Sequence, residues 1–400
     1  MTSASTRFQS YWWVVIAAAI LVSVTMGTRQ AFGLYMPSFS EINGTGREFF
    51  GLAIALQNLL WGVASPIAGG LADKYGCGRV AIWGSLVYGL GLLAMSASIP
   101  LGLFGGQFLI GLGLAGGGFS VALGAIGKNV PAEKRTFALG VGSAGGSFGQ
   151  FALVPISDVL AIQLGWAAAF ACLAGMAVAL MLPSSFVLKN YDVRLATKSL
   201  DRKLKDVLSE AFRNADYVLL TLGFFVCGLQ VAFVATHLPG YLADHNISST
   251  VASWALSLIG LFNIFGTLIC GWLGTRYSKK NCLSILYVLR SAVIIVFISA
   301  PPTPISTLVF SACLGLVWLG TVPLTSGLVA HFFGPVYMSM LYGFVFLSHQ
   351  MGSFMGAWMG GFLYDANANY LMMWYITVIM GLVAAVLHLP IKEKNYVMVN

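Results

Sequence analysis

The chain has 400 residues, of which 58% are hydrophobic and 8% are charged, and its formal net charge is +8. A soluble protein of this size cannot hide so much apolar surface from water, so an ordinary soluble enzyme is excluded. The apolar residues form runs of about 20 and do not alternate with polar ones, which argues against a transmembrane β-barrel. The basic residues lie in short loops between these runs, so their excess does not indicate nucleic-acid binding.

Apolar runs long enough to cross a bilayer recur on both sides of one polar stretch. The first six cover roughly 11–38, 49–71, 80–98, 101–126, 137–157 and 166–187. The second six cover roughly 217–240, 251–274, 282–300, 304–330, 337–363 and 371–390. We therefore predict an all-α membrane protein with twelve transmembrane helices. Its predicted parts are an N-terminal six-helix bundle (1–187), a cytoplasmic linker (188–216) and a C-terminal six-helix bundle (217–400).

The distribution of Lys and Arg predicts the orientation. Eighteen of the 21 lie in the terminal segments, the linker and the loops of one side, whereas the other side holds only Arg47. The remaining two, Arg29 and Arg290, fall inside spans. Basic residues accumulate on the cytoplasmic side, so both termini are predicted to be cytoplasmic, in a cell inner membrane. Within the linker, 201–213 has apolar residues at helical spacing, which predicts an amphipathic helix on the membrane surface; a solvated linker is the alternative.

The two halves of the chain resemble each other at an offset near 200. Gly69, Leu71, Lys74 and Tyr75 match Gly271, Leu273, Arg276 and Tyr277 at an offset of 202. The sequence Gly-Ser-Phe recurs at 146–148 and 352–354, and an Asp follows at 158 and 365. Parallel six-helix repeats are a transporter architecture, with the substrate site near the membrane midplane between the halves.

The segment 69–79 (GGLADKYGCGR) resembles the loop 2–3 signature of the major facilitator superfamily, with Asp73 and Gly76 at matching positions. Cys77 and Gly78 depart from the basic pair of that signature, and Arg79 follows them. The segment 131–135 (PAEKR) resembles the loop 4–5 of the family, and the glycines at 140–149 resemble its Gly-rich helix 5. Residues 29–33 (RQAFG) resemble the monocarboxylate and oxalate–formate branch.

This resemblance implies a fold and a gate. The two six-helix pseudo-repeats would surround a central cavity lined by helices 1, 4, 7 and 10. Asp73 would pair with a basic residue of the neighbouring inner loop and sit at a helix N-terminus of the other half, which holds the inner side shut. The gating residues are then Asp73, Arg79, Lys134 and Arg135.

Arg29 is the strongest candidate for substrate contact. A charge inside a span is costly, so it needs a partner or a watery cavity. A guanidinium binds a carboxylate in a planar, two-pronged geometry. All 13 acidic residues fall in loops or near helix ends, so an anionic substrate is the simplest neutraliser. Pairing with backbone carbonyls, or snorkelling to the surface, is the alternative for Arg29, and a structural bridge between helices is favoured for Arg290.

Further polar or aromatic candidates lie at membrane depth. Gln230 falls opposite Arg29 in the repeat when Gly228 is aligned with Gly27. His237 and His349 could bind a proton or serve as helix–helix contacts. The predicted substrate-binding set is Arg29, Gln230, Asn58, His237, Trp318 and His349.

The function predicted from these residues is secondary active transport of a small organic anion, coupled to protons or to anion exchange. Transport of a neutral or heterocyclic compound, and a receptor without transport, are the alternatives. No enzyme signature, cofactor motif or metal site is recognised, and the six cysteines form no CxxC pair. The expected partners are a small-molecule substrate and the lipid bilayer, and the protein is expected to be a monomer.

Overall fold

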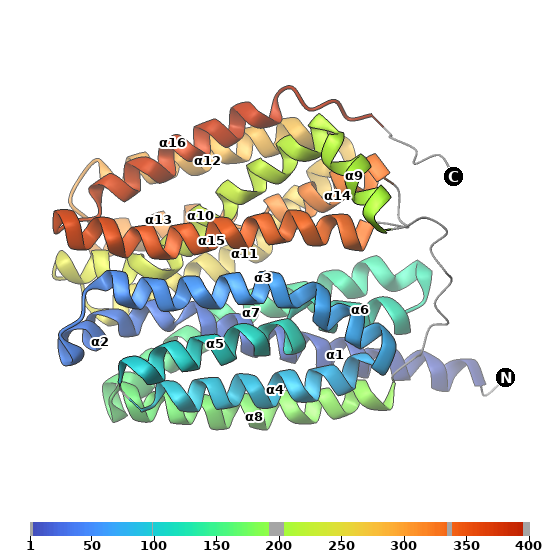
Figure 1. Ribbon diagram of the computed structural model, residues 1–400, viewed down its shortest axis with the longest axis horizontal. Helices are drawn as coiled ribbons and strands as arrows, with labels where there is room; N and C mark the ends of the chain where they lie inside the picture. Colours follow the sequence, from blue (N-terminus) through green and yellow to red (C-terminus); the bar gives the residue numbers. More distant parts are fainter. Residues whose placement is uncertain (1–2, 98, 192–203, 334–337, 395–400) are drawn as a thin grey trace. The chain divides into compact units, whose positions relative to one another are not determined.

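The computed structural model describes residues 3–97, 99–191, 204–333 and 338–394; for 3–10, 73, 132–137, 204–207 and 338–340 it describes the backbone alone. Every regular element in these ranges is helical (Figure 1). A bilayer offers a backbone no hydrogen-bond partners, so a segment that crosses it must satisfy its own N–H and C=O groups, as a helix does. The predicted all-α membrane fold is confirmed.

The helices follow the predicted apolar runs. The first half of the chain forms α1 (Ser3–Gln30), the 3₁₀ turn η1 (Phe32–Tyr35), α2 (Met36–Asn43), α3 (Arg47–Tyr75), α4 (Cys77–Met95), α5 (Pro100–Gly117), α6 (Phe119–Asn129), α7 (Ala132–Leu164) and α8 (Trp166–Asn190). The second half forms α9 (Leu204–Arg213), α10 (Ala215–Asp244), α11 (Ser249–Arg276), α12 (Lys279–Ile298), α13 (Pro304–Leu316), α14 (Thr321–Phe333), α15 (Met338–Asn367) and α16 (Leu371–His388). The helix predicted in the linker is present as α9, while residues 192–203 lie outside the described ranges.

Eleven helical spans in the described part of the chain are long and apolar enough to cross a membrane. The remaining long helix, α15, matches the predicted eleventh span and carries Ser348, His349 and Gln350 near its centre. The backbone of α15 lies against α10 at several glycines, which places part of its surface against protein and away from lipid.

Three of the predicted spans are interrupted, although the sequence suggested continuous helices. The first breaks between α1 and α2 at η1, the fourth at Gly118 between α5 and α6, and the tenth at 317–320 between α13 and α14. Gly118 follows Gly116 and Gly117, and glycine is a poor helix former because it loses the most backbone entropy. Side chains, described below, stabilise the carbonyl groups at the third break.

The chain divides into two compact units. Unit 1 comprises 1–45 and 56–196, and unit 2 comprises 46–55 and 197–400. In unit 1, α1 packs on α7 and α4 on α8; in unit 2, α10 packs on α15 and α12 on α16. In each half of the chain, the first span therefore packs on the fifth, and the third span packs on the sixth. The internal repeat seen in the sequence therefore reappears as equivalent packing.

Glycines permit the closest of these helix contacts in both units. A Cβ on Gly149 of α7 would stand 2.0 Å from the carbonyl oxygen of Ser23 in α1. A Cβ on Gly352 of α15 would stand 1.9 Å from the carbonyl oxygen of Phe225 in α10. Small residues at such contacts let two backbones approach inside a membrane, so these glycines determine the spacing of the first and fifth span of each half.

Candidate functional site

Arg29 lies in the last turn of α1, just before the helix gives way to η1. The carbonyl groups at a helix C-terminus carry a partial negative charge, which favours a cation there. Its side chain is half-buried. The break in the first span therefore positions a guanidinium at the end of a helix, inside a segment that crosses the membrane.

Two residues of α3 hold the Arg29 side chain. Nη2 of Arg29 donates a hydrogen bond to Oδ1 of Asn58, and the guanidinium carbon lies 5.3 Å from the ring centroid of Trp61. Nε of Arg29 is buried and has no hydrogen-bond partner among the described residues, and the same holds for Nδ2 of Asn58. The structure thus brings together two of the predicted substrate-binding residues, and each keeps an N–H donor available.

The site around Arg29 carries positive charge that no described acidic residue balances. No ion pair of Arg29 is formed among the described side chains, whereas Arg47 pairs with Asp244. A buried donor that finds no acceptor costs free energy, and a buried cation costs more. A group that accepts hydrogen bonds would satisfy the two free donors of Arg29 and Asn58.

Arg290, the second arginine inside a span, is fully buried in α12. Its Nε and Nη2 donate to the carbonyl oxygen of Val317 over 3.1 and 2.7 Å, and Nη2 also donates to the carbonyl oxygen of Trp318. Its Nη1 donates to Oε1 of Gln230 over 2.9 Å and lies 3.6 Å from Sγ of Cys227. A guanidinium has five N–H donors, and these contacts use them all. Arg290 bridges helices, as the sequence suggested.

The contacts of Arg290 also explain the break between α13 and α14. Residues 317–320 are not helical, so the carbonyl groups at the end of α13 lack helical partners. Arg290 supplies the missing donors. Trp318, a predicted substrate-binding residue, lies at this break with its side chain 1% exposed. Both polar atoms of the Gln230 side chain have partners: Oε1 accepts from Arg290, and Nε2 donates to the carbonyl oxygen of Thr377 over 2.8 Å.

The two predicted histidines lie apart in unit 2. Nε2 of His237 is 2.7 Å from the carbonyl oxygen of Ala357, and Nδ1 is 3.2 Å from the hydroxyl of Tyr370. His349 of α15 packs its ring against Phe224 and Phe346 at centroid distances of 4.8 and 5.9 Å. Both rings are buried among helices of their own unit.

The structure does not describe the side chains of most of the predicted gating residues. Asp73, Lys134 and Arg135 belong to helical segments of which only the backbone is described. Arg79 lies in the first turn of α4 and is exposed. The pairing of Asp73 with a basic residue stays a prediction.

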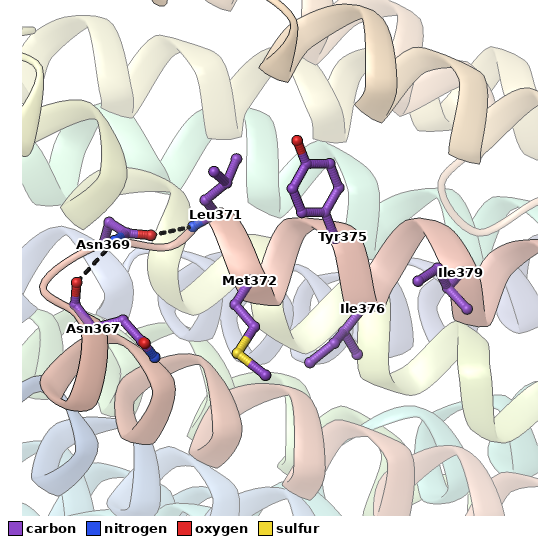
Figure 2. Close-up of a pocket in the computed structure, with 7 residues that line it drawn as sticks. All are labelled: Asn367, Asn369, Leu371, Met372, Tyr375, Ile376 and Ile379. Atoms are coloured by element: carbon purple, nitrogen blue, oxygen red, sulfur yellow. Dashed lines mark hydrogen bonds between the residues drawn. The ribbon is translucent and has the colours of Figure 1, made fainter.

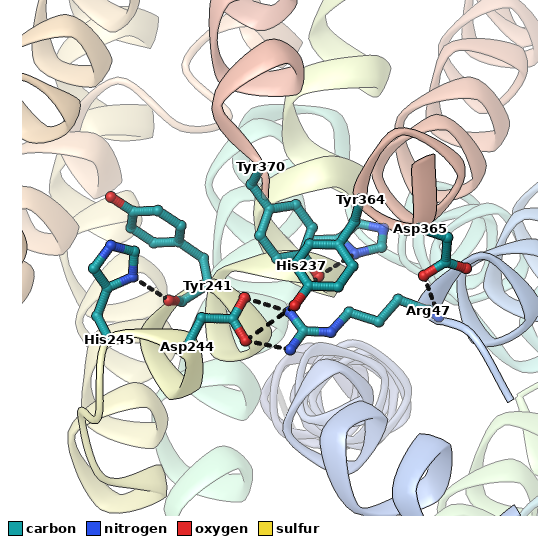
Figure 3. Close-up of polar contacts among 8 residues, drawn as sticks. All are labelled: Arg47, His237, Tyr241, Asp244, His245, Tyr364, Asp365 and Tyr370. Carbon is teal, nitrogen blue, oxygen red and sulfur yellow. Dashed lines mark hydrogen bonds and ion pairs between the residues drawn. The ribbon is translucent and has the colours of Figure 1, made fainter. Parts of the chain in front are cut away.

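Sequence reasoning missed a polar cluster around Arg47, at the first turn of α3. Figure 3 shows its guanidinium beside the carboxylate of Asp244 and against the rings of Tyr364 and Tyr370. The guanidinium carbon lies 3.8 Å from the ring centroid of Tyr364, and Nη1 donates to the hydroxyl of Tyr370 over 3.0 Å. One feature of the sequence could have indicated this cluster: Arg47 is the only Lys or Arg in the loops on the side predicted to face away from the cytoplasm. Burial raises the pKa of Tyr370 above its ordinary value, so its hydroxyl keeps its proton.

A shallow hollow at the start of α16 is open to the surface (Figure 2). Most of its lining is apolar and exposed, which is expected of a helix face that meets lipid tails. We therefore assign it no substrate. Its lining residues are Asn367, Asn369, Leu371, Met372, Tyr375, Ile376 and Ile379.

Comparison with protein families matches the chain to the Major Facilitator Superfamily twice, over residues 18–244 and 220–397. Among curated proteins, it is 22% identical over 402 residues to "Uncharacterized MFS-type transporter YcxA" of Bacillus subtilis, which covers 96% of each chain. It is 21% identical over 371 residues to "Monocarboxylate transporter 13" of Bos taurus, which covers 90% of this chain and 84% of that protein. Among solved structures, a D-xylose-proton symporter matches with a TM-score of 0.77 at 14% identity, over 96% of this chain and 100% of that one.

Proposed function

Because the chain belongs to the major facilitator superfamily, we propose that it is a secondary active transporter that moves a small organic anion across the membrane. The proposed substrate class is monocarboxylate-like, and the proposed mechanism is alternating access with proton coupling or anion exchange. The proposed location is a cell inner membrane, with both termini and the linker in the cytoplasm. The asymmetric distribution of Lys and Arg supports this orientation.

The observation that supports an anionic substrate is the contrast between the two arginines inside spans. All five donors of Arg290 have protein acceptors, whereas Arg29 keeps a buried Nε–H without one. A carboxylate that accepts this donor, together with Nδ2 of Asn58, would satisfy two buried groups at once. Trp61 provides an apolar surface for the hydrocarbon part of the substrate.

The contribution of Arg29 to substrate affinity can be estimated from the strength of a hydrogen bond between charged groups. A hydrogen bond to a charged group contributes about 1.5–3 kcal/mol net, which corresponds to roughly 10- to 150-fold in affinity. The similarity to a protein named as a monocarboxylate transporter supports the same substrate class.

Transport by purified protein in proteoliposomes tests this proposal. Uptake is measured for a panel of labelled monocarboxylates and for the amide and alcohol of the same carbon skeletons. We expect wild type to take up one or more of the anions and Arg29→Gln to lose at least about tenfold of that uptake. Arg29→Lys should recover little, because an ammonium cannot reproduce the two-pronged geometry.

The matched control is Arg276→Gln. Arg276 also lies against a tryptophan, with its guanidinium carbon 4.6 Å from the ring centroid of Trp272, but it is exposed at the end of α11. This variant should transport like wild type. If Arg29→Gln transports the anions as well as wild type does at equal protein content, the anion proposal is wrong. Uptake of the neutral analogues by both proteins would then favour the neutral-substrate alternative.

A further inference from the structure

The first turn of α3 is held in unit 2 by side chains from other helices. The carboxylate of Asp365, in α15, accepts hydrogen bonds from the backbone N–H groups of Arg47 and Glu48 over 2.9 and 2.8 Å. The guanidinium of Arg47 forms its ion pair with Asp244 at the end of α10 (Figure 3). Oε1 of Glu48 accepts from Nε1 of Trp358 over 2.9 Å. We call these contacts the α3 latch.

The α3 latch lies within unit 2, close to the residue at which α3 passes from one unit to the other. Residues 46–55 cluster with unit 2, whereas α3 from residue 56 onward clusters with unit 1. Any motion that displaces the first turn of α3 from the rest of unit 2 must break these contacts. The contacts are polar and partly exposed, so water can replace them when the helix leaves.

His237 packs against the backbone of this segment of α3. A Cβ on Gly51 of α3 would stand 2.3 Å from the carbonyl oxygen of Ala357 and 3.4 Å from Cε1 of His237. That carbonyl oxygen is the group to which His237 is hydrogen-bonded. The backbone of α3 therefore covers both His237 and its acceptor, and His237 is 0% exposed.

The hydrogen bonds determine the charge of His237 in this arrangement. A carbonyl oxygen only accepts, so Nε2 of His237 carries a proton and donates to Ala357. Nη1 of Arg47 donates to the hydroxyl oxygen of Tyr370, and that hydroxyl can donate its proton to Nδ1 of His237. Nδ1 is then an acceptor and the imidazole is neutral. The chain of hydrogen bonds runs from Arg47 through Tyr370 to His237.

A proton on Nδ1 would disrupt this chain. The hydroxyl of Tyr370 could no longer donate to His237, and its oxygen would face two cations, the imidazolium and the guanidinium of Arg47. The imidazolium would also be buried beside Tyr370 without an acceptor for its Nδ1–H, and Asp244 neutralises the guanidinium of Arg47 only in part, so the closed arrangement disfavours the charged imidazole.

We propose that His237 is the proton sensor of the α3 latch, which stays closed while His237 is neutral and opens when His237 takes up a proton. Opening separates 46–55 from the rest of unit 2 and lets water reach the imidazole. A hydronium ion from the solvent then transfers its proton to the lone pair of Nδ1 and becomes water. Because the closed state excludes the proton and the open state accepts it, acidification favours the open state. The inference holds whether the substrate is an anion or a neutral compound.

Other titratable groups face the same region from each neighbouring helix. Besides Arg47 and Glu48 on α3, they are Tyr241, Asp244 and His245 at the end of α10, Tyr364 and Asp365 on α15, and Tyr370 before α16. His245 is exposed and contacts the carbonyl oxygen of Tyr241 over 2.8 Å. It is therefore the natural control for His237, since it is the same residue type near the same end of the same helix.

Hydrogen–deuterium exchange of the full chain in lipid nanodiscs tests the proposal without any substrate. The reporters are the backbone amides of Arg47 and Glu48, which Asp365 protects only in the closed state, with each rate divided by its intrinsic rate at the same pH. With an ordinary value of about 6.5 for a solvated imidazole, opening should increase about 30-fold from pH 8 to pH 5. The amide of Leu371, which donates to Oδ1 of Asn369, should change little over this range.

Three variants identify the responsible group. His237→Gln keeps a donor for Ala357 but does not titrate, so its opening should change less than about threefold between pH 8 and pH 5; His245→Gln should keep the wild-type response. Tyr370→Phe removes the hydroxyl that links Arg47 to His237, so it should open more at pH 8 and still respond to pH. A wild type with no pH response overturns the proposal, as does a His237→Gln variant with the full response. If His237→Gln does not fold, an unchanged opening of Tyr370→Phe at pH 8 overturns it equally.

Discussion

Nη1 of Arg290 lies 2.9 Å from Oε1 of Gln230, and Nε2 of the same glutamine lies 2.8 Å from the carbonyl oxygen of Thr377. This pair of bonds connects α12 through α10 to α16. Alignment of the two halves placed Gln230 opposite Arg29, but in the fold its amide serves the other arginine. The side chains of Arg290 and Gln230 thus find their partners within unit 2, while Nε of Arg29 in unit 1 keeps an N–H donor available.

Arg290→Met should destabilise the protein strongly. The substitution leaves the carbonyl oxygens of Val317 and Trp318 and the amide oxygen of Gln230 buried without donors, at a combined cost of about 3 kcal/mol or more. Thermal unfolding in detergent measures this loss. Arg29→Gln is the matched variant and should cost less than about 1 kcal/mol, because Arg29 makes one hydrogen bond and is half-buried. Equal stabilities of the two variants would contradict the conclusion that the hydrogen bonds of Arg290 stabilise the fold.

Gly149→Ala should loosen the contact between α1 and α7. The added Cβ would stand 2.0 Å from the carbonyl oxygen of Ser23, so the two helices must separate, at about 1–3 kcal/mol. Gly140→Ala, on the same helix, meets nothing within 4 Å and should leave the stability unchanged or slightly raised. Thermal unfolding of both variants provides the comparison, and equal losses would show that general helix effects dominate.

Asp365→Asn should weaken the cap on α3. The carboxylate accepts one backbone N–H with each of its oxygens, whereas a carboxamide can accept only one of the two and turns its NH₂ toward the other, at a cost of about 0.5–2 kcal/mol. Exchange at the amides of Arg47 and Glu48 should therefore rise roughly 2- to 30-fold at constant pH. Asn369→Ala removes the cap on Leu371 instead and should accelerate exchange at α16 alone. Unchanged exchange at α3 in Asp365→Asn would show that Asp365 does not hold this helix.

The proposed orientation predicts the labelling of single cysteines in a background without native cysteine. Cysteines at Asn43 and Asn246 should react with a membrane-impermeant maleimide in intact cells, because they lie between spans on the side that holds only Arg47. A cysteine at Lys198 should react only after the membrane is opened. Labelling at Lys198 from outside would reverse or disprove the orientation.

The predicted gate can be tested at Asp73. Asp73→Asn keeps the shape of the side chain and removes the charge that would bind a basic residue and a helix N-terminus, so transport should slow about tenfold or more. Membrane abundance should fall far less. Thr275 occupies the position after Gly274 at the end of α11, where the repeat places no acid, and Thr275→Asn is the matched control with near-normal transport. Normal kinetics in Asp73→Asn would rule out this gate.

Local properties of the chain determined the membrane-spanning architecture. Placing about 20 apolar residues in water is so unfavourable, and an unpaired backbone in lipid so costly, that length and hydropathy alone predict the helices. The family could also be identified from short motifs, because the segments around Asp73 and Gly149 each act within a few turns of one helix or loop. The equivalent packing of α1 on α7 and of α10 on α15 follows from repeats that are visible in the sequence.

Tertiary structure alone decided which polar groups are satisfied. In the sequence, Arg29 and Arg290 are both single arginines inside apolar runs, and the expectation that Arg290 bridges helices identified none of its hydrogen-bond partners. They differ because Arg290 faces a broken helix whose carbonyl oxygens lie 27 and 28 positions away, whereas Arg29 meets one amide 29 positions away. The α3 latch joins Arg47 to Asp244 and Asp365 over 197 and 318 positions. A side chain's hydrogen-bond partners depend on which helices pack together, and hydropathy and periodicity do not carry that information.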